Sequence, residues 1–159
     1  HWHFIGHLQS NKVKYIAPFV SLIQGVDSKK LIGEIDKQAQ KCGRIIDCLL
    51  QVHIASEETK FGLDENELRE IFKGGYTDLK NVRICGMMGM ASFTDNIKKV
   101  REEFRHLKSL FERYAPLAVD HSAFAILSMG MSSDYEIAIE EGSSMVRIGS
   151  LLFGQRINT

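Results

Sequence analysis

The feature that most constrains the fold of this chain is a regular alternation of short apolar runs and helical patterns. Apolar runs that suit buried strands occur at residues 2–6, 22–27, 45–55, 82–90, 124–130 and 145–150. Helical composition lies between them at residues 10–20, 28–42, 64–73, 95–114 and 134–141, and the first of these helices is interrupted near Pro18. Repeated strand–helix units of this kind predict an α/β fold with a parallel sheet.

Two of the predicted helices carry clear internal signals. In the longest, apolar residues recur at spacings of 3 and 4, namely Ile97, Val100, Phe104, Leu107, Phe111 and Tyr114. A coiled coil could use the same stripe, but a single helix of under three heptads favours packing onto a sheet. Before the helix at residues 134–141, Ser133 followed by Glu136 matches a capping box.

The length of the chain helps to choose between a closed barrel and an open, doubly wound sheet. Eight units in a (β/α)8 barrel need about 250 residues, and six units here occupy 159 at the same density. The chain also starts at His1 inside an apolar segment, without an initiator Met. We therefore expect one TIM-barrel domain over residues 1–159, N-terminally truncated, with six of eight units, the third to the eighth.

Composition excludes several classes of function. Twenty Lys plus Arg balance twenty Asp plus Glu, which offers no standing attraction for nucleic acid or an anionic membrane. No apolar run approaches the roughly 18 residues of a membrane span. The three cysteines are odd in number and contain no C-x-x-C pair, so a disulfide framework is not indicated. A cytoplasmic protein is expected.

The last two predicted strands are followed by loops that could bind an anion. The loop after residue 130 leads into a helix N-terminus with free N–H groups, and Gly149-Ser150 end the next strand. Phosphate sites of barrels commonly lie after the last two strands. The alternative, in which Gly130, Gly149 and the serines only form turns and caps, fits the spacing equally well.

Arg147 is the most unusual residue of this block, because it lies between Val146 and Ile148 in an apolar strand. A charged side chain there needs a partner. It is either one half of a structural ion pair or a ligand-binding group that points into the mouth of the barrel, and the neighbouring anion loops favour the ligand.

Other candidate groups are weaker. Three histidines near the start, His1, His3 and His7, have no carboxylate or Cys at ligand spacing nearby, so no metal site is expected. The histidines elsewhere, His53, His106 and His121, belong to no Ser/His/Asp or Cys/His arrangement. The methionines that end the strand at residues 82–90 fill the core or line a pocket.

Taken together, these residues resemble the pyridoxal phosphate homeostasis protein family, which is related in fold to the N-terminal barrel of alanine racemase. The resemblance covers essentially the whole chain. Its motifs are WHFIGHLQSNK at 2–12, LQVHIASEETKFG at 50–62, GMMGM at 86–90, LSMGMSSD at 127–134 and GSSMVRIGSLLFG at 142–154. The chain departs from the family at His53, where Asn is more common, and at Ser144, where Thr is frequent.

The resemblance implies a cofactor, pyridoxal 5′-phosphate, and residues that hold it. By this comparison Ser132 and the backbone of Gly149 and Ser150 bind the cofactor phosphate, Arg147 faces the pyridine nitrogen, and Met90 flanks the cofactor. An arginine there would keep the ring nitrogen unprotonated, which weakens the ring as an electron sink. That arrangement suits mild chemistry or simple carriage of the cofactor.

The resemblance also implies an absence. The family's Schiff-base lysine lies upstream of the WHFIG segment, so it is not expected in this chain, and neither Lys12 nor Lys60 matches its position. No catalytic residue is therefore assigned. The expected role is an intracellular carrier and buffer of the cofactor, monomeric when full length, with apo-forms of cofactor-dependent enzymes as partners. Alternatives are a racemase-like enzyme and a phosphosugar-binding barrel.

Overall fold

The computed structural model describes residues 1–56, 61–75 and 78–154, and within them six strands form one sheet. Every neighbouring pair is parallel, and the strand order follows the chain from first to last. The strands are β1 (Trp2–Phe4), β2 (Val20–Val26), β3 (Ile46–Val52), β4 (Val82–Gly89), β5 (Ile126–Met131) and β6 (Met145–Arg147). A doubly wound sheet would reverse its strand order, so that alternative is wrong.

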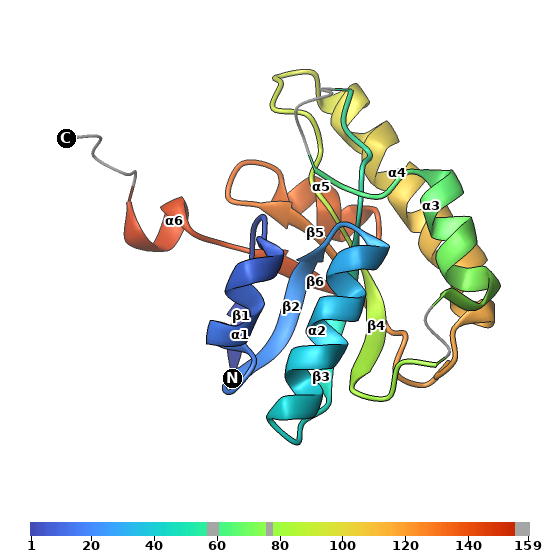
Figure 1. Ribbon diagram of the computed structural model, residues 1–159. Helices are drawn as coiled ribbons and strands as arrows, with labels where there is room; N and C mark the ends of the chain where they lie inside the picture. The colour runs from blue at the N-terminus through green and yellow to red at the C-terminus, as the bar shows by residue number, and fades with distance from the viewer. Residues whose placement is uncertain (57–60, 76–77, 155–159) are drawn as a thin grey trace.

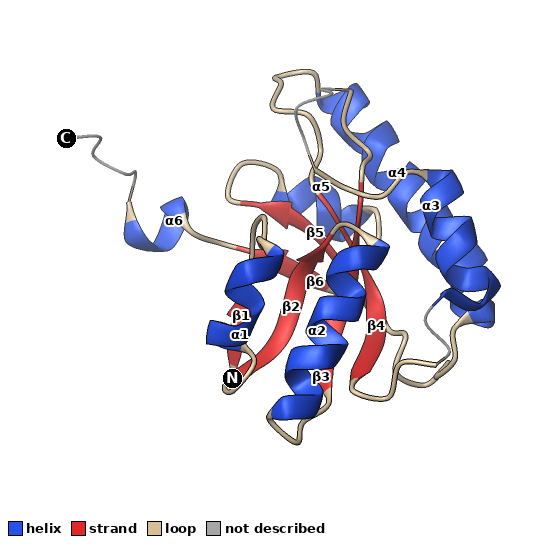
Figure 2. Ribbon diagram, in the orientation of Figure 1, coloured by secondary structure: helices blue, strands red, loops and turns tan. Residues whose placement is uncertain are grey.

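A helical segment follows each strand, which confirms the predicted series of six strand–helix units. The segments are η1 (Ser10–Lys12) with α1 (Val13–Ile16), α2 (Lys29–Lys41), α3 (Glu65–Glu70) with η2 (Ile71–Gly75), α4 (Ile97–Tyr114) with η3 (Ala115–Leu117), α5 (Tyr135–Glu140) and α6 (Ser150–Phe153). Figures 1 and 2 show α1, α2, α3 and α4 on the outside of the curved sheet, whereas α6 extends away from it.

Both faces of the sheet are covered by apolar side chains. Successive residues of a strand point to opposite faces, so neighbours in the sequence belong to different clusters. Ile23 and Leu50 belong to the large core between the sheet and the helices. Their sequence neighbours Leu22 and Leu49 belong to a smaller cluster on the other, concave face, together with Met88. This double burial explains why the strands read as nearly continuous apolar runs.

The sheet is strongly curved, and the smaller apolar cluster lies on its concave face. In a flat sheet β2 and β5 would stand about 14 Å apart, at about 4.8 Å for each step between neighbouring strands. The hydroxyl of Ser128 on β5 nevertheless donates a hydrogen bond of 2.7 Å to Gln24 on β2. The six strands therefore form part of a barrel wall, in which β1 and β6 each pair on one side only.

The helical segment predicted at residues 10–20 is interrupted before Pro18, as expected. It consists of one 3-10 turn and one α-helical turn that ends at Ile16, since Pro18 has no N–H to donate and disfavours helix in the residue before it. The chain then enters β2 already at Val20.

Two further boundaries differ from the prediction. The N-cap of α5 is Asp134 rather than Ser133, so the predicted capping box is wrong there, whereas one is formed by Asp64 and Glu67 at α3. In the long helix α4, which packs on the sheet as expected, Ile97 is 61% exposed because it lies in the first turn, before the stripe reaches the core.

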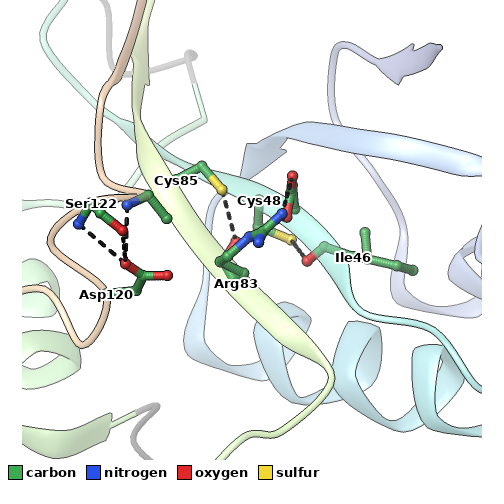
Figure 3. A network of polar contacts seen from close by, with 8 residues as sticks. Ile46, Cys48, Arg83, Cys85, Asp120 and Ser122 are labelled. Carbon is green, nitrogen blue, oxygen red and sulfur yellow. Dashed lines mark hydrogen bonds and ion pairs between the residues drawn. The ribbon is translucent and has the colours of Figure 1, made fainter.

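A polar cluster occupies the N-terminal ends of β3 and β4, far along the strands from the predicted ligand loops (Figure 3). Arg83 donates two hydrogen bonds to Asp47, at 2.7 and 2.9 Å, and this pairing raises the pKa of Arg83. The Cys85 thiol donates to the backbone oxygen of Arg83, and burial raises its pKa to about 11. Through the contact between Arg83 and Asp47, the cluster joins the two central strands at their N-terminal ends, opposite the predicted ligand loops.

Candidate functional site

The loops after β5 and β6 meet at one serine hydroxyl. Ser132 Oγ accepts hydrogen bonds from the backbone N–H groups of Gly149, at 3.2 Å, and Leu151, at 3.4 Å. The carboxyl ends of parallel strands share one edge of a sheet, which is why two loops 17 residues apart come together here. Backbone N–H groups and a hydroxyl gathered at one place are the groups from which phosphate-binding loops are built.

Gly149 leaves open space beside these donors. A Cβ placed on it would meet no atom within 4 Å, and both Gly149 and Ser150 are exposed. The backbone of Gly149 has a φ of −116°, which any residue can adopt. What glycine provides at this position is therefore close access to the backbone for a ligand rather than a special conformation.

Arg147 lies beneath these loops on the concave side, where it is 8% exposed. Its Nη1 donates to Ser128 Oγ at 2.8 Å and its Nη2 to the backbone oxygen of Gly89 at 3.1 Å. Its Nε is buried and has no hydrogen-bond partner among the described residues. The guanidinium thus keeps its Nε–H available for an acceptor that the described chain does not supply.

The electrostatics of Arg147 support this reading. Burial lowers the pKa of the guanidinium to about 10, and the charge of Asp134 opposes that shift. No ion pair to Arg147 is found within the described residues, so the alternative of a structural ion pair has no support there. A positive charge held in a buried position without an ion-pair partner is unfavourable unless a ligand interacts with it.

Met90 follows β4 and is half-buried against the concave cluster that contains Leu22, Leu49, Cys85 and Met88. Gly89, immediately before it, supplies the backbone oxygen that holds Arg147. Met90 therefore lies at the same edge of the sheet as the arginine.

A cavity of about 400 Å³ opens beside this group, between the loops after β4 and β5. Its lining includes Met131, Ser133 and Asp134, the neighbours of Ser132, and on the other side Ser92 and Asp95. Asp134 is fixed there because its Oδ1 accepts from the N–H of Met131 at 2.6 Å. The cavity adjoins Ser132 but is not lined by Arg147, Gly149, Ser150 or Met90.

Sequence reasoning missed two residues that the structure brings to Arg147, namely Ser128 and Gln24. Both are buried, at 0% and 1% exposure, and both interrupt apolar strands. A polar residue inside such a run was the available signal, because a buried polar group requires a partner. The identity of that partner is not encoded locally, since Ser128 and Gln24 are 104 residues apart.

The other candidate residues lie elsewhere. His7 contacts Asp27 at 2.9 Å and stacks on Phe61, and His3 lies near Gln24. Within the described ranges, no three His, Cys, Asp or Glu side chains are grouped so that they could hold a metal ion. No helix in the described part of the chain is long and apolar enough to cross a membrane. Lys60 lies outside the described residues.

Comparison with known proteins gives a consistent family. The model of the alanine racemase N-terminal domain matches residues 2–157. A pyridoxal phosphate homeostasis protein of Aquifex aeolicus is 46% identical over 98% of this chain and 67% of its own length. The human protein of the same name is 34% identical over 98% of this chain and 58% of its own length. The chain thus spans about two thirds of the length of such relatives.

Solved structures agree with the sequence comparisons. PipY of Synechococcus elongatus, solved with pyridoxal phosphate bound, has a TM-score of 0.83 and 31% identity over 96% of this chain and 70% of its own. Alanine racemase of Clostridium difficile has a TM-score of 0.72 at 15% identity over 98% and 40%, which is a likeness of fold. The chain belongs to the pyridoxal phosphate homeostasis protein family, within the wider family of alanine racemase N-terminal domains.

Proposed function

We propose that this chain forms the cofactor-binding part of a protein that carries pyridoxal 5′-phosphate and buffers its supply, without catalytic turnover of its own. The observation that carries the proposal is the Nε–H of Arg147, buried without a partner among the described residues, on the strand that leads to Gly149, whose backbone contacts Ser132. Relatives that bear the name of homeostasis proteins, and PipY with the cofactor bound, support the same role.

Each residue has a defined task in this proposal. The hydroxyl of Ser132 and the backbone N–H groups of Gly149 and Ser150 bind the phosphate, with the open space at Gly149 admitting its oxygens. Arg147 donates its Nε–H to the ring nitrogen, and Met90 packs against the ring. An anion and a neutral acceptor nitrogen together suit a site that holds one positive charge.

Arginine at the ring nitrogen limits the chemistry. The cofactor supplies a reactive aldehyde and, when its ring nitrogen is protonated, a strong electron sink. A guanidinium whose pKa is about 10 remains protonated at neutral pH, so it donates a hydrogen bond and gives up no proton. The ring nitrogen then stays unprotonated, which favours binding and release over demanding catalysis at carbon.

The remaining expectations belong to this proposal. We infer that the six units are the third to the eighth of an eight-unit barrel, a reading that the curvature and the one-sided pairing of β1 and β6 support. The free thiols of Cys42, Cys48 and Cys85 support a reducing, cytoplasmic location. A monomer that delivers the cofactor to apo-enzymes is the simplest form of such a carrier.

The phosphate cradle can be tested by comparing ligands with and without phosphate. Ser132→Ala should weaken binding of pyridoxal 5′-phosphate about tenfold, because the phosphate loses the hydroxyl donor and the loop after β6 loses the contact that holds its backbone in place. Binding of pyridoxal, measured by the same absorbance titration, should change little. Ser122→Ala, at the other end of the strands, is the matched control.

The outcomes separate the candidate functions. If a phosphosugar binds as tightly as the cofactor, the chain is a general phosphate-binding barrel and the proposal fails. Exchange of the α-hydrogen of added amino acids for deuterium, above the rate with free cofactor, would identify an enzyme. Borohydride reduction followed by mass spectrometry reports whether the cofactor is held by a lysine of this chain, where no adduct is expected.

A further inference from the structure

A buried chain of hydrogen bonds runs from Arg147 across the concave face of the sheet. Arg147 Nη1 donates to Ser128 Oγ at 2.8 Å, and Ser128 Oγ lies 2.7 Å from Gln24 Oε1. The three residues come from β6, β5 and β2, and none is more than 8% exposed. Gln24 Nε2 in turn lies 3.4 Å from both His3 Nδ1 and Met145 Sδ.

The direction of each bond is fixed by the chemistry of the groups. A guanidinium has donors only, so the Ser128 hydroxyl must accept from Arg147. The single hydroxyl proton of Ser128 is then free for Gln24, whose Oε1 accepts it. This in turn directs the amide nitrogen of Gln24 toward His3 and Met145. Gln24 is thus the acceptor that determines the orientation of the two groups before it.

We propose that Gln24 is a positioning residue of the cofactor site, which acts through Ser128 to hold the guanidinium of Arg147. This inference rests on the proposed function, in which Nε faces the ring nitrogen of the cofactor. Nη1 is held by Ser128 and Nη2 by Gly89, and two anchors on the two Nη atoms fix the plane of the guanidinium. Nε is the guanidinium nitrogen that has no partner among the described residues, so its N–H can point at the ligand.

The alternative is that Gln24 only fills space in the concave core, and the first test distinguishes the two without any cofactor. In the wild-type chain the side-chain N–H resonances of Arg147 should be resolved and slow to exchange in ¹⁵N NMR spectra, because the guanidinium cannot rotate. Gln24→Met keeps an unbranched side chain but removes the acceptor, so these resonances should broaden or exchange faster. Gln24→Glu, which restores an acceptor oxygen, should recover them.

Gln51 provides the matched control. It lies on the adjacent strand β3 and is 2% exposed, but its Nε2 donates to the backbone oxygen of Phe61. Gln51→Met therefore makes the same substitution at the same depth outside the chain of bonds, and the Arg147 resonances should not change. If Gln24→Met does not fold, Ser128→Ala breaks the chain one step nearer to Arg147 and permits the same comparison.

The second test uses the ring nitrogen itself. Gln24→Met should lower the affinity for pyridoxal 5′-phosphate about tenfold, and the affinity for an analogue with CH in place of the ring nitrogen by less than about twofold. An equal loss for both ligands, or unchanged Arg147 resonances, overturns the proposed role of Gln24. If the wild-type chain binds neither ligand, the proposed function fails, while the resonances still decide whether Gln24 orients the guanidinium.

Discussion

Arg147 keeps a positive charge at a position that is only 8% exposed. Burial lowers the pKa of its guanidinium well below the ordinary arginine range, to about 10, so the unfolded chain holds this proton more tightly than the folded chain does. Folding is therefore opposed by a penalty that is fully present at neutral pH and declines as the pH rises through about 10 toward the ordinary pKa range of arginine. The residue is maintained at a cost to stability, as is typical of residues that serve a ligand.

Replacement of the arginine tests this trade-off. The lowered pKa corresponds to a folding penalty of about 3 kcal/mol, which the substitution removes. The substitution also removes the hydrogen bonds to Ser128 and Gly89, each of which stabilises the folded chain by about 1 kcal/mol. We expect Arg147→Met to raise the free energy of unfolding by about 1 kcal/mol at neutral pH and to abolish tight cofactor binding. Urea denaturation at neutral pH measures the first effect, and a less stable variant would contradict the assignment.

At the scale of the elements, β4 carries a local irregularity that the sequence pattern did not reveal. Cys48 and Leu49 of β3 are consecutive, but they pair with Ile84 and Gly86 of β4, so Cys85 is an extra residue in the ladder. Gly86 has a φ of 149°, and a Cβ there would lie 1.8 Å from the backbone oxygen of Ile126. The irregularity places β5 so close to β4 that only glycine fits.

A pair of identical substitutions tests this close approach. Gly86→Ala should destabilise the chain by about 3 kcal/mol or more, because it strains the backbone and overlaps the neighbouring strand. Gly33→Ala in α2, where a Cβ would meet no atom within 4 Å, should stabilise it by about 0.5 to 1 kcal/mol. The midpoint of thermal or urea unfolding measures the stability change of each variant. An equal change at the two positions would refute the close approach of β4 and β5.

For the whole molecule, the dominant feature is a curved sheet with two edges. Strands β1 and β6 each have a neighbour on one side only within the described sheet. Trp2 on β1 is 73% exposed, and Ile5 just after the strand is 51% exposed. An edge strand with exposed apolar side chains is a template for pairing with another chain.

This geometry predicts that the isolated chain self-associates through β1. Trp2→Lys adds a charge to the edge strand, so sedimentation velocity should detect a larger monomer fraction at the same concentration. Phe93→Lys changes a still more exposed aromatic residue, at 90%, in the loop after β4, away from both edges, and should have little effect. If the two variants behave alike, general surface hydrophobicity rather than the edge drives association.

The sequence by itself determined the features that depend on neighbours along the chain. Alternating runs predicted six strand–helix units, and the apolar spacing predicted that α4 packs on the sheet. The order of the elements also assigned candidate anion-binding loops to the ends of the last two strands. The sequence pattern misplaced the capping box, because several polar residues near a helix start compete for one N-cap.

Only the tertiary structure decided which distant residues meet across the concave face. The curvature of the sheet brings Gln24 on β2 to Ser128 on β5, and through Ser128 to Arg147, although flat spacing would separate β2 and β5 by about 14 Å. Curvature is the sum of small twists and irregularities over several strands, such as the one at Cys85. No local pattern specifies that sum, so the partners that orient the buried arginine emerge only in the folded chain.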